Sequence, residues 1–375
     1  MWKVQLFKLD YGEAEKQALM DVLDSGWITM GEKTKTFEEE FSKYLGGGVS
    51  SLAVSSCTAG LHMALLALGI GPGDEVMVPA STFIADLNVV MMVGATPVSI
   101  DAASLDDWNI SVVDMKRKIT KKTKAIIALH FAGHPFDPKI IEIARENNIL
   151  IIEDVAHAIG GSRNGKMCGT WGDVSAFSFF ANKNLAVGEG GMFVAADPNV
   201  FDKGRFLRSH GMSTLSFDRH EGRAISYDVL QPGLNYRMDE FRAALGQIQL
   251  AKLNENNLKR KKLVQRYQQL LKGTPLQIPF QDIPENTTFS YHIFPVLLPA
   301  ETDRLAFIGH MKQAQVQTSI HYPAYREFTY YKNIIKEPTP VSDEISARVV
   351  TLPLYPTMTQ EQVELVCHSV ANFFR

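Results

Sequence analysis

The chain has 375 residues, of which 45% are hydrophobic, and this supports one large core and a smaller second unit. Its formal net charge is −3, so no overall field favours nucleic acid or an anionic membrane, and a bound phosphate would need a local site. Its three cysteines, Cys57, Cys168 and Cys367, are too few for a disulfide framework and lack the spacing of metal ligands. Because no signal peptide and no apolar run of about 18 residues is found, we expect a cytoplasmic protein.

Short β-rich runs alternate with helix-length segments from residue 51 to about 200, which is typical of a mainly parallel sheet covered by helices. The expected strands lie at 51–55, 75–79, 96–100, 124–130, 150–154, 174–179 and 192–196. Apolar residues at helical spacing predict helices at 61–70, 86–95 and 138–147. The predicted fold class is therefore α/β, with a seven-stranded sheet.

After Asp239 the pattern changes to long helical stretches that lead into a smaller unit. The basic run at 259–262 is expected on a solvated face of these helices. The smaller unit is predicted to contain strands at 289–298 and 316–322 and helices at 303–315 and 359–374. We expect a large domain over residues 1–250, including an N-terminal segment, and a small C-terminal α+β domain over 251–375.

Lys183 lies between an apolar β-like run and a glycine-rich turn at 188–191. An amine that is partly desolvated there would have a lowered pKa and could attack a carbonyl carbon. A single lysine in a loop is usually a solvated surface residue, so Lys183 is a candidate only together with partners.

The strand predicted at 150–154 delivers Asp154 to its carboxyl end, where parallel α/β sheets bind ligands. An acid at this place can pair with the ring nitrogen of pyridoxal phosphate, although a helix-capping acid is an equal alternative. Nearby, Ala156 is small enough to pack against such a ring and His157 could reach its phenolic oxygen, unless it is a structural histidine. Phe83, at the end of another strand, could stack on the ring or simply pack in the core.

Small polar residues end the first strand and open a helix, which presents backbone N–H groups and a positive helix end to an anion. The candidate phosphate contacts are Cys57, Thr58 and Ala59. Ordinary capping of the helix by Ser55, Ser56 or Thr58 is the alternative.

Several segments in order resemble the DegT/DnrJ/EryC1/StrS family of nucleotide-sugar aminotransferases, which are fold-type I pyridoxal-phosphate enzymes. The segments are SGWITMG (25–31), SSCTAGLHMAL (55–65), GDEVMVPASTFIA (73–85), VGATPVSID (93–101), IIEDVAHAIG (151–160), SFFANKNLAVGEGG (178–191), PGLNYRMDEFRAALGQIQL (232–250) and HYPAYR (321–326).

The resemblance implies that Lys183 binds the aldehyde carbon of pyridoxal 5′-phosphate and that Asp154 is the partner of the pyridine nitrogen. It also implies the other cofactor contacts: Phe83 and Ala156 on the two ring faces, Thr58, Ala59 and Ser178 at the phosphate, and His157 near the phenolic oxygen. A cysteine at position 57, where the family often has Ala or Gly, is harmless if only its backbone N–H is used. A lysine at 183 argues against the dehydratases of the family, which carry histidine there.

In the family, the asparagine of the NYR element reaches the phosphate of the partner subunit. Asn235, with Arg237 beside it, therefore implies an obligate homodimer with shared active sites.

The implied activity transfers an amino group from glutamate, giving 2-oxoglutarate, to the keto carbon of a nucleotide-linked keto-deoxy-sugar. The segments WITMG, DRH (218–220) and PGLNYRMDE resemble the branch that aminates C4 of UDP- or dTDP-linked sugars, such as those of lipopolysaccharide O-antigen; C3 amination is the alternative. The candidate substrate contacts are Trp27, Arg237, His321, Tyr322 and Tyr325, of which the last three could equally be packing residues.

Two other classes of protein fit the sequence less well. A pyridoxal-phosphate-binding regulator without turnover is not supported by any DNA-binding helix pair or basic stripe. An NAD-dependent enzyme would need G-x-G-x-x-G after the first strand, and GEGG at 188–191 does not supply it.

Overall fold

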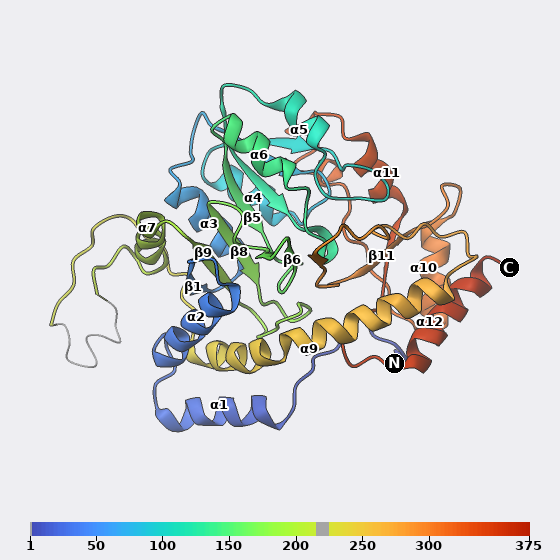
Figure 1. Cartoon of the computed structure of the whole chain (residues 1–375), viewed down its shortest axis with the longest axis horizontal. Helices are drawn as coiled ribbons and strands as arrows, with labels where there is room; N and C mark the ends of the chain where they lie inside the picture. Colours follow the sequence, from blue (N-terminus) through green and yellow to red (C-terminus); the bar gives the residue numbers. More distant parts are fainter. Residues whose placement is uncertain (1, 215–224) are drawn as a thin grey trace.

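The computed structural model describes residues 2–214 and 225–375, and its centre is a seven-stranded sheet (Figure 1). In spatial order the strands are β1 (Ser50–Val54), β9 (Gly191–Ala195), β8 (Val174–Ser178), β5 (Leu150–Asp154), β4 (Thr123–Leu129), β2 (Glu75–Pro79) and β3 (Thr96–Ile100). Strand β9 is antiparallel to both its neighbours, whereas the pairs from β8 to β3 are parallel. The predicted α/β fold with a mainly parallel seven-stranded sheet is confirmed, and each expected strand end lies within one residue of the observed one.

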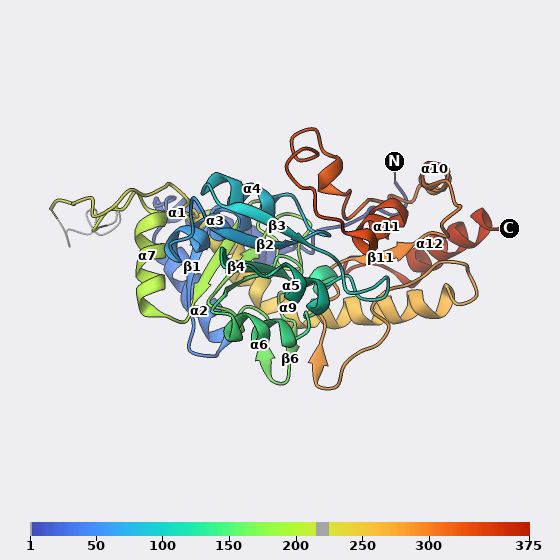
Figure 2. The same ribbon diagram turned by 90° about the horizontal axis from the view of Figure 1, so that it is seen from above.

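Helices cover both faces of this sheet, which explains why its strands are apolar almost throughout. One face packs against α3 (Cys57–Ala67), α4 (Ala85–Met92) and α7 (Pro198–Arg208). The other face packs against α2 (Glu32–Leu45), α5 (Val112–Lys118), α6 (Lys139–Glu146) and the first half of α9 (Glu240–Leu270). Figure 2 shows α4 on one side of the strands and α5 and α6 on the other.

Helix α9 is 31 residues long, about 46 Å, and extends from the large sheet to the C-terminal part of the chain (Figure 1). Asp239 caps its start by accepting a hydrogen bond from the Arg242 N–H. Its first turns contact α1 (Glu13–Ser25) and α2, and its last turns contact α12 (Gln360–Phe373). Residue 250, where the sequence suggested a domain boundary, lies inside this helix.

The basic run at 259–262 is only partly solvated, which corrects the expectation for it. Arg260 is buried, and its guanidinium donates hydrogen bonds to the carbonyls of His292 (3.1 Å) and Leu354 (3.0 Å). Burial lowers its pKa to about 9. This arginine joins α9 to two loops of the C-terminal part.

The C-terminal part has its own apolar core. It is built from β11 (Phe294–Leu297), α10 (Arg304–Gln313), α11 (Pro340–Arg348), β12 (Val349–Leu352) and α12. The smaller elements of the molecule are β6 (Ser162–Arg163), β7 (Lys166–Met167), β10 (Thr287–Thr288) and the 3₁₀ turns Phe131–Gly133 and Tyr325–Glu327.

Two strand predictions in this part need correction. The strand expected at 289–298 begins only at Phe294, because Tyr291 has φ 50°, a left-handed conformation that interrupts an extended chain. The strand expected at 316–322 is not formed. Val316 and Ser319 make single bridges to two different partners, Val4 and Thr351, so no continuous ladder develops. The true partner of β11 is β12, which the sequence did not indicate.

Within residues 2–214 and 225–375, no helix combines the length and apolar character needed to cross a membrane. The same residues contain no group of three or more His, Cys, Asp or Glu side chains placed to hold a metal ion. The DRH segment at 218–220 lies outside the described residues.

Candidate active site

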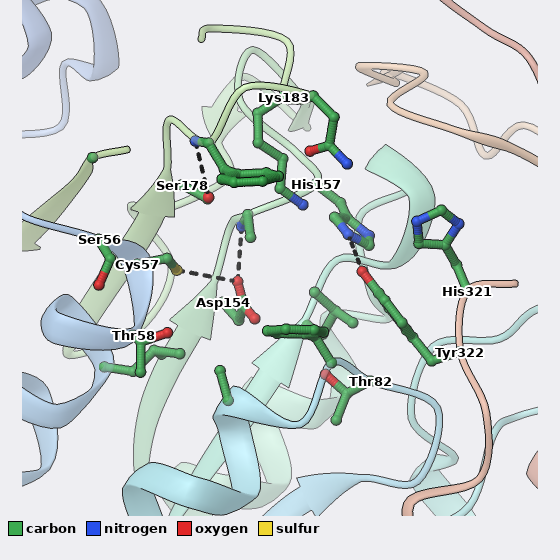
Figure 3. A pocket seen from close by; sticks show the side chains of 18 of the residues that line it. Ser56, Cys57, Thr58, Thr82, Asp154, His157, Ser178, Lys183, His321 and Tyr322 are labelled. Atoms are coloured by element: carbon green, nitrogen blue, oxygen red, sulfur yellow. Dashed lines mark hydrogen bonds between the residues drawn. The ribbon is translucent and has the colours of Figure 1, made fainter. Parts of the chain in front are cut away.

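A cavity of about 340 Å³ opens at the carboxyl ends of the central strands (Figure 3). Its walls come from the start of α3, the ends of β5 and β8, the loop after β8, and residues 321 and 322 of the C-terminal part. It brings together ten of the residues singled out in the sequence: Cys57, Thr58, Phe83, Asp154, Ala156, His157, Ser178, Lys183, His321 and Tyr322.

Lys183 and Asp154 face the same space, and in Figure 3 the lysine side chain extends toward the carboxylate. Desolvation by burial lowers the pKa of Lys183 to about 8, against the opposing effects of Asp154 and Cys57. Burial raises the pKa of Asp154, while the Ala156 N–H, which donates to its Oδ1 at 2.8 Å, and the charge of Lys183 act in the other direction. An amine of this pKa is a competent nucleophile near neutral pH.

The start of α3 lies beside this pair. Ser56 is the N-cap residue, and its Oγ accepts a hydrogen bond from the Ala59 N–H at 3.0 Å. The capping alternative is therefore right for Ser56, and the Ala59 N–H is already used. Cys57 and Thr58 line the cavity at the positive end of the helix, which suits an anion. Burial and the charge of Asp154 raise the pKa of the Cys57 thiol, so Cys57 is no nucleophile.

His157 and Tyr322 form a hydrogen-bonded pair on the opposite wall (Figure 3). The Nδ1 of His157 accepts the Ala132 N–H at 3.3 Å, so its Nε2 carries the proton and donates to the Tyr322 hydroxyl at 2.8 Å. Burial and the neighbouring Lys183 lower the pKa of His157 well below its usual value. His321 is oriented by Thr351, whose Oγ1 is 2.9 Å from its Nδ1.

Five of the predicted site residues do not line the cavity within one chain: Trp27, Ala59, Asn235, Arg237 and Tyr325. Tyr325 is buried in the core and its hydroxyl lies 2.5 Å from Ser99 Oγ, so the packing alternative is right for it. Asn235 is exposed and forms a backbone bridge with Ser209. Arg237 pairs through its backbone with Val54, at the end of β1.

The sequence reading missed Asp86, which is fully buried in the first turn of α4. Its Oδ2 accepts a hydrogen bond from Thr82 Oγ1 at 2.5 Å, while its Oδ1 has no hydrogen-bond partner among the residues that the structure describes. Burial and the charge of Asp154 raise its pKa well above the usual value. The sequence did contain a signal for Asp86, because it is an acidic residue in an otherwise apolar helix. Aspartate is rarely buried unless it has a partner or a function.

Asn182 was also missed. It lines the cavity next to Lys183, and its buried Oδ1 has no hydrogen-bond partner within residues 2–214 and 225–375. Such an acceptor is expected in a wall that a polar ligand completes. Together with the amine of Lys183, the carboxyl group of Asp154 and the N–H groups of Cys57 and Thr58 at the start of α3, it fits a ligand that has a carbonyl group, a basic ring nitrogen and a phosphate.

Comparison with known proteins agrees with this chemistry. Residues 10–371 match the model of the DegT/DnrJ/EryC1/StrS aminotransferase family. An uncharacterised protein of Methanocaldococcus jannaschii is 36% identical, covering 97% of this chain and 96% of its own. The aminotransferase TlmJ from Streptoalloteichus hindustanus is 32% identical with a TM-score of 0.91, covering 99% of this chain and 98% of its own.

A further similar structure, from Streptococcus pneumoniae, is provisionally classed as a sugar aminotransferase and was solved in its PMP-form. Its TM-score is 0.92 at 29% identity, covering 99% of this chain and 98% of its own, and the same protein is known in a PLP-form. These similarities confirm the predicted fold type and, at the level of the family, the predicted pyridoxal-phosphate cofactor. The chain belongs to the DegT/DnrJ/EryC1/StrS aminotransferase family.

Proposed function

We propose that the protein is a pyridoxal-phosphate-dependent aminotransferase that moves an amino group from glutamate to the keto carbon, C4, of a UDP- or dTDP-linked keto-deoxy-sugar. The observation that carries this proposal is that Lys183 and Asp154 line the same cavity in a chain of this family. A sugar as the acceptor is supported by similar proteins, among them PseC of Helicobacter pylori, an aminotransferase involved in the biosynthesis of pseudoaminic acid, at 25% identity. The C4 position and the UDP or dTDP group rest on the resemblance of the sequence segments.

When bound, pyridoxal phosphate supplies an aldehyde carbon that bonds to amines and a ring that withdraws electrons from the reacting carbon. Lys183 holds the cofactor through its Nζ. Once free, the amine would take a proton from the α-carbon of glutamate and give it to the former aldehyde carbon of the cofactor. In the second half of the reaction it would move a proton in the opposite direction, from that carbon to the keto carbon of the sugar. Its pKa of about 8 leaves a useful fraction unprotonated at neutral pH.

The other cavity residues hold and orient the cofactor. Asp154 accepts the hydrogen bond of the ring nitrogen and keeps that nitrogen protonated. The phosphate would be bound by the backbone N–H groups of Cys57 and Thr58 and by the hydroxyl of Ser178. Phe83 and Ala156 would pack against the ring. The Nε2–H of His157, which donates to Tyr322 here, would donate to the phenolic oxygen when the cofactor is bound.

The acceptor sugar is proposed to enter past His321 and Tyr322, which reach the cavity from the C-terminal part of the chain. Trp27, Asn235 and Arg237 lie outside the cavity of their own chain. Asn235 is exposed, and this supports a homodimer in which the residue serves the partner's phosphate site.

Borohydride reduction followed by peptide mapping tests the central assignment. The protein should be purified yellow, and reduction should attach the cofactor covalently to Lys183. A label on any other lysine would remove Lys183 from its proposed role. The Lys183→Ala variant is the control, since it should lose both the colour and the label.

The acceptor is tested with glutamate and a panel of UDP-, dTDP- and GDP-linked keto-sugars, with the products identified by mass and NMR. Amination at C4 of a UDP- or dTDP-sugar is expected. Amination at C3 would select the alternative position. Trapping on Lys183 without turnover of any keto-sugar would instead indicate a cofactor-binding regulator.

A further inference from the structure

A chain of side-chain hydrogen bonds connects the long helix α9 to the amine of Lys183. The Nδ2 of Asn257, on α9, lies 3.0 Å from the carbonyl of Ile159, and its Oδ1 lies 2.8 Å from Asn184 Nδ2. Asn184 Oδ1 lies 3.1 Å from His292 Nδ1, and His292 Nε2 lies 3.4 Å from Lys183 Nζ. The two asparagines and the histidine are all buried.

The direction of the hydrogen bonds in this series is fixed by backbone carbonyls, which can only accept hydrogen bonds. Backbone carbonyls have no proton to donate, so the carbonyl of Ile159 requires the amide NH₂ of Asn257 on its side. The carbonyl of Ser290 requires the NH₂ of Asn184 in the same way, at 2.7 Å. Each amide therefore presents its oxygen to the next member of the chain.

This order determines the tautomer of His292. Because Asn184 presents an oxygen, the Nδ1 of His292 must carry the proton, and its Nε2 is left with a free electron pair. Burial, with the charges of Lys183, His157, Arg260 and His321, lowers the pKa of His292 well below its usual value, so the ring stays neutral. The free pair is directed at Lys183 Nζ.

We propose that His292 is a positioning residue for Lys183. The Nε2 of His292 accepts a hydrogen bond from the Lys183 amine and so fixes where Nζ lies in the cavity. Helix α9 supports this residue twice. Asn257 orients the ring through Asn184, and Arg260 donates to the backbone carbonyl of His292 at 3.1 Å. In the reaction, His292 would hold the amine whenever it is not bonded to the cofactor, ready to transfer a proton. This role rests on the proposed function of Lys183.

Two substitutions separate this role from simple packing. The oxygen of a glutamine can occupy the position of Nε2, so His292→Gln keeps an acceptor for Lys183. The amide of an asparagine occupies the position of Nδ1, so His292→Asn keeps the contact with Asn184 and loses the acceptor. Both changes leave Asp154, whose negative charge acts on Lys183, unaltered.

The first measurement uses the full-length protein loaded with pyridoxamine phosphate, in which the Lys183 amine is free. The rate of its chemical modification is followed against pH by mass spectrometry. Loss of the acceptor destabilises the ammonium form, so at neutral pH His292→Asn should be modified faster, by up to about tenfold, and His292→Gln at nearly the wild-type rate. The turnover number should also fall about tenfold or more in His292→Asn only, with little change in KM.

The second measurement needs no variant to be active. Nitrogen-15 labelling of histidine distinguishes protonated from unprotonated ring nitrogens by NMR, and the His292 signals are those absent from His292→Gln. A protonated Nδ1 with an unprotonated Nε2 is expected. The opposite tautomer, or a His292→Asn protein that matches the wild type while His292→Gln does not, would overturn the proposal. Borohydride trapping on Lys183 is independent of both results, so a failure here is distinguishable from a failure of the proposed function.

Discussion

Asp154 shares its buried surroundings with a second carboxyl group, that of Asp86. Ionising two neighbouring carboxyl groups away from water costs more free energy than ionising one of them. Burial and the charge of Asp154 raise the pKa of Asp86. Asp86 is therefore the member that keeps its proton, which leaves the negative charge with Asp154. Asp86 is thus the neutral aspartic acid of the pair and Asp154 the charged one.

We predict that Asp86→Asn makes the stability of the protein less dependent on pH. A carboxyl whose pKa is raised on folding binds its proton more tightly in the folded state, so it destabilises the fold increasingly as pH rises from about 4 toward the raised value. Asparagine imitates the neutral acid and removes this loss. Melting temperatures of the cofactor-saturated protein across pH should therefore favour the variant more at higher pH. Asp24→Asn, at an exposed position, is the control, and an equal response of both variants would contradict the prediction.

Asp154→Asn should fold and yet lose turnover by about a hundredfold or more, because a neutral amide no longer favours the protonated ring nitrogen. Circular dichroism and the turnover number with glutamate measure the two effects. Near-normal turnover with the cofactor bound would show that Asp154 is only structural.

Among the elements, α2 depends on a residue of another helix. The carboxylate of Glu240, in the first turn of α9, accepts N–H bonds from Gly31 (2.8 Å), Lys33 (2.7 Å) and Thr34 (2.9 Å) at the start of α2. It also accepts the Thr34 hydroxyl at 2.6 Å. A buried carboxylate thus satisfies the N–H groups that a helix start leaves open.

We predict that Glu240→Gln lowers the free energy of unfolding by about 2 to 3 kcal/mol, since its amide NH₂ must then face an N–H donor. Urea denaturation measures this value. The control is Glu40→Gln, which changes an exposed glutamate in α2, the helix that Glu240 caps. It should have almost no effect on the free energy of unfolding. Equal losses in the two variants would mean that Glu240 does not act as a cap.

The elements also show what the sequence could reveal. The strands of the large sheet were predictable because burial on both faces makes them mostly apolar. The strands near 289–298 and 316–322 were not, since Tyr291 adopts a left-handed φ and the segment from Val316 is paired by residues as distant as Val4 and Thr351. In the site, Lys183 and Asp154 follow predictable strand ends. The contact between His292 and Lys183, 109 residues apart, exists only in the folded chain.

At the scale of the whole molecule, large apolar side chains are exposed in many places, and two of these places lie near the residues of the proposed site. Phe83 and Phe180 at the cavity are 56% and 43% exposed, and Val229 and Leu230 are 54% and 57% exposed in the segment that leads to Asn235. Phe83 and Phe180 face the cavity, whereas exposed apolar side chains such as Val229 and Leu230 favour association with another chain. This agrees with the proposed homodimer.

The shared site predicts complementation between two inactive proteins. Lys183→Ala and Asn235→Ala should each be nearly inactive. In a mixed dimer one site would carry both lesions and the other neither, so activity should return to about half of the wild-type value per heterodimer. Native mass spectrometry confirms that heterodimers formed. If confirmed heterodimers stay as inactive as the parents, Asn235 acts within its own subunit.

The continuous course of α9 limits how the chain can change in length. Gln249 of α9 donates a hydrogen bond to Glu15 at 2.7 Å. Further along the same helix, Asn257 contacts Asn184 and Arg260 contacts His292. Inserting one residue between these positions would turn everything after it by about 100° and shift it by about 1.5 Å. Asn257 and Arg260 would then point away from Asn184 and His292. Insertions and deletions should therefore be tolerated in surface loops such as 281–286, while α9 can vary only by substitution.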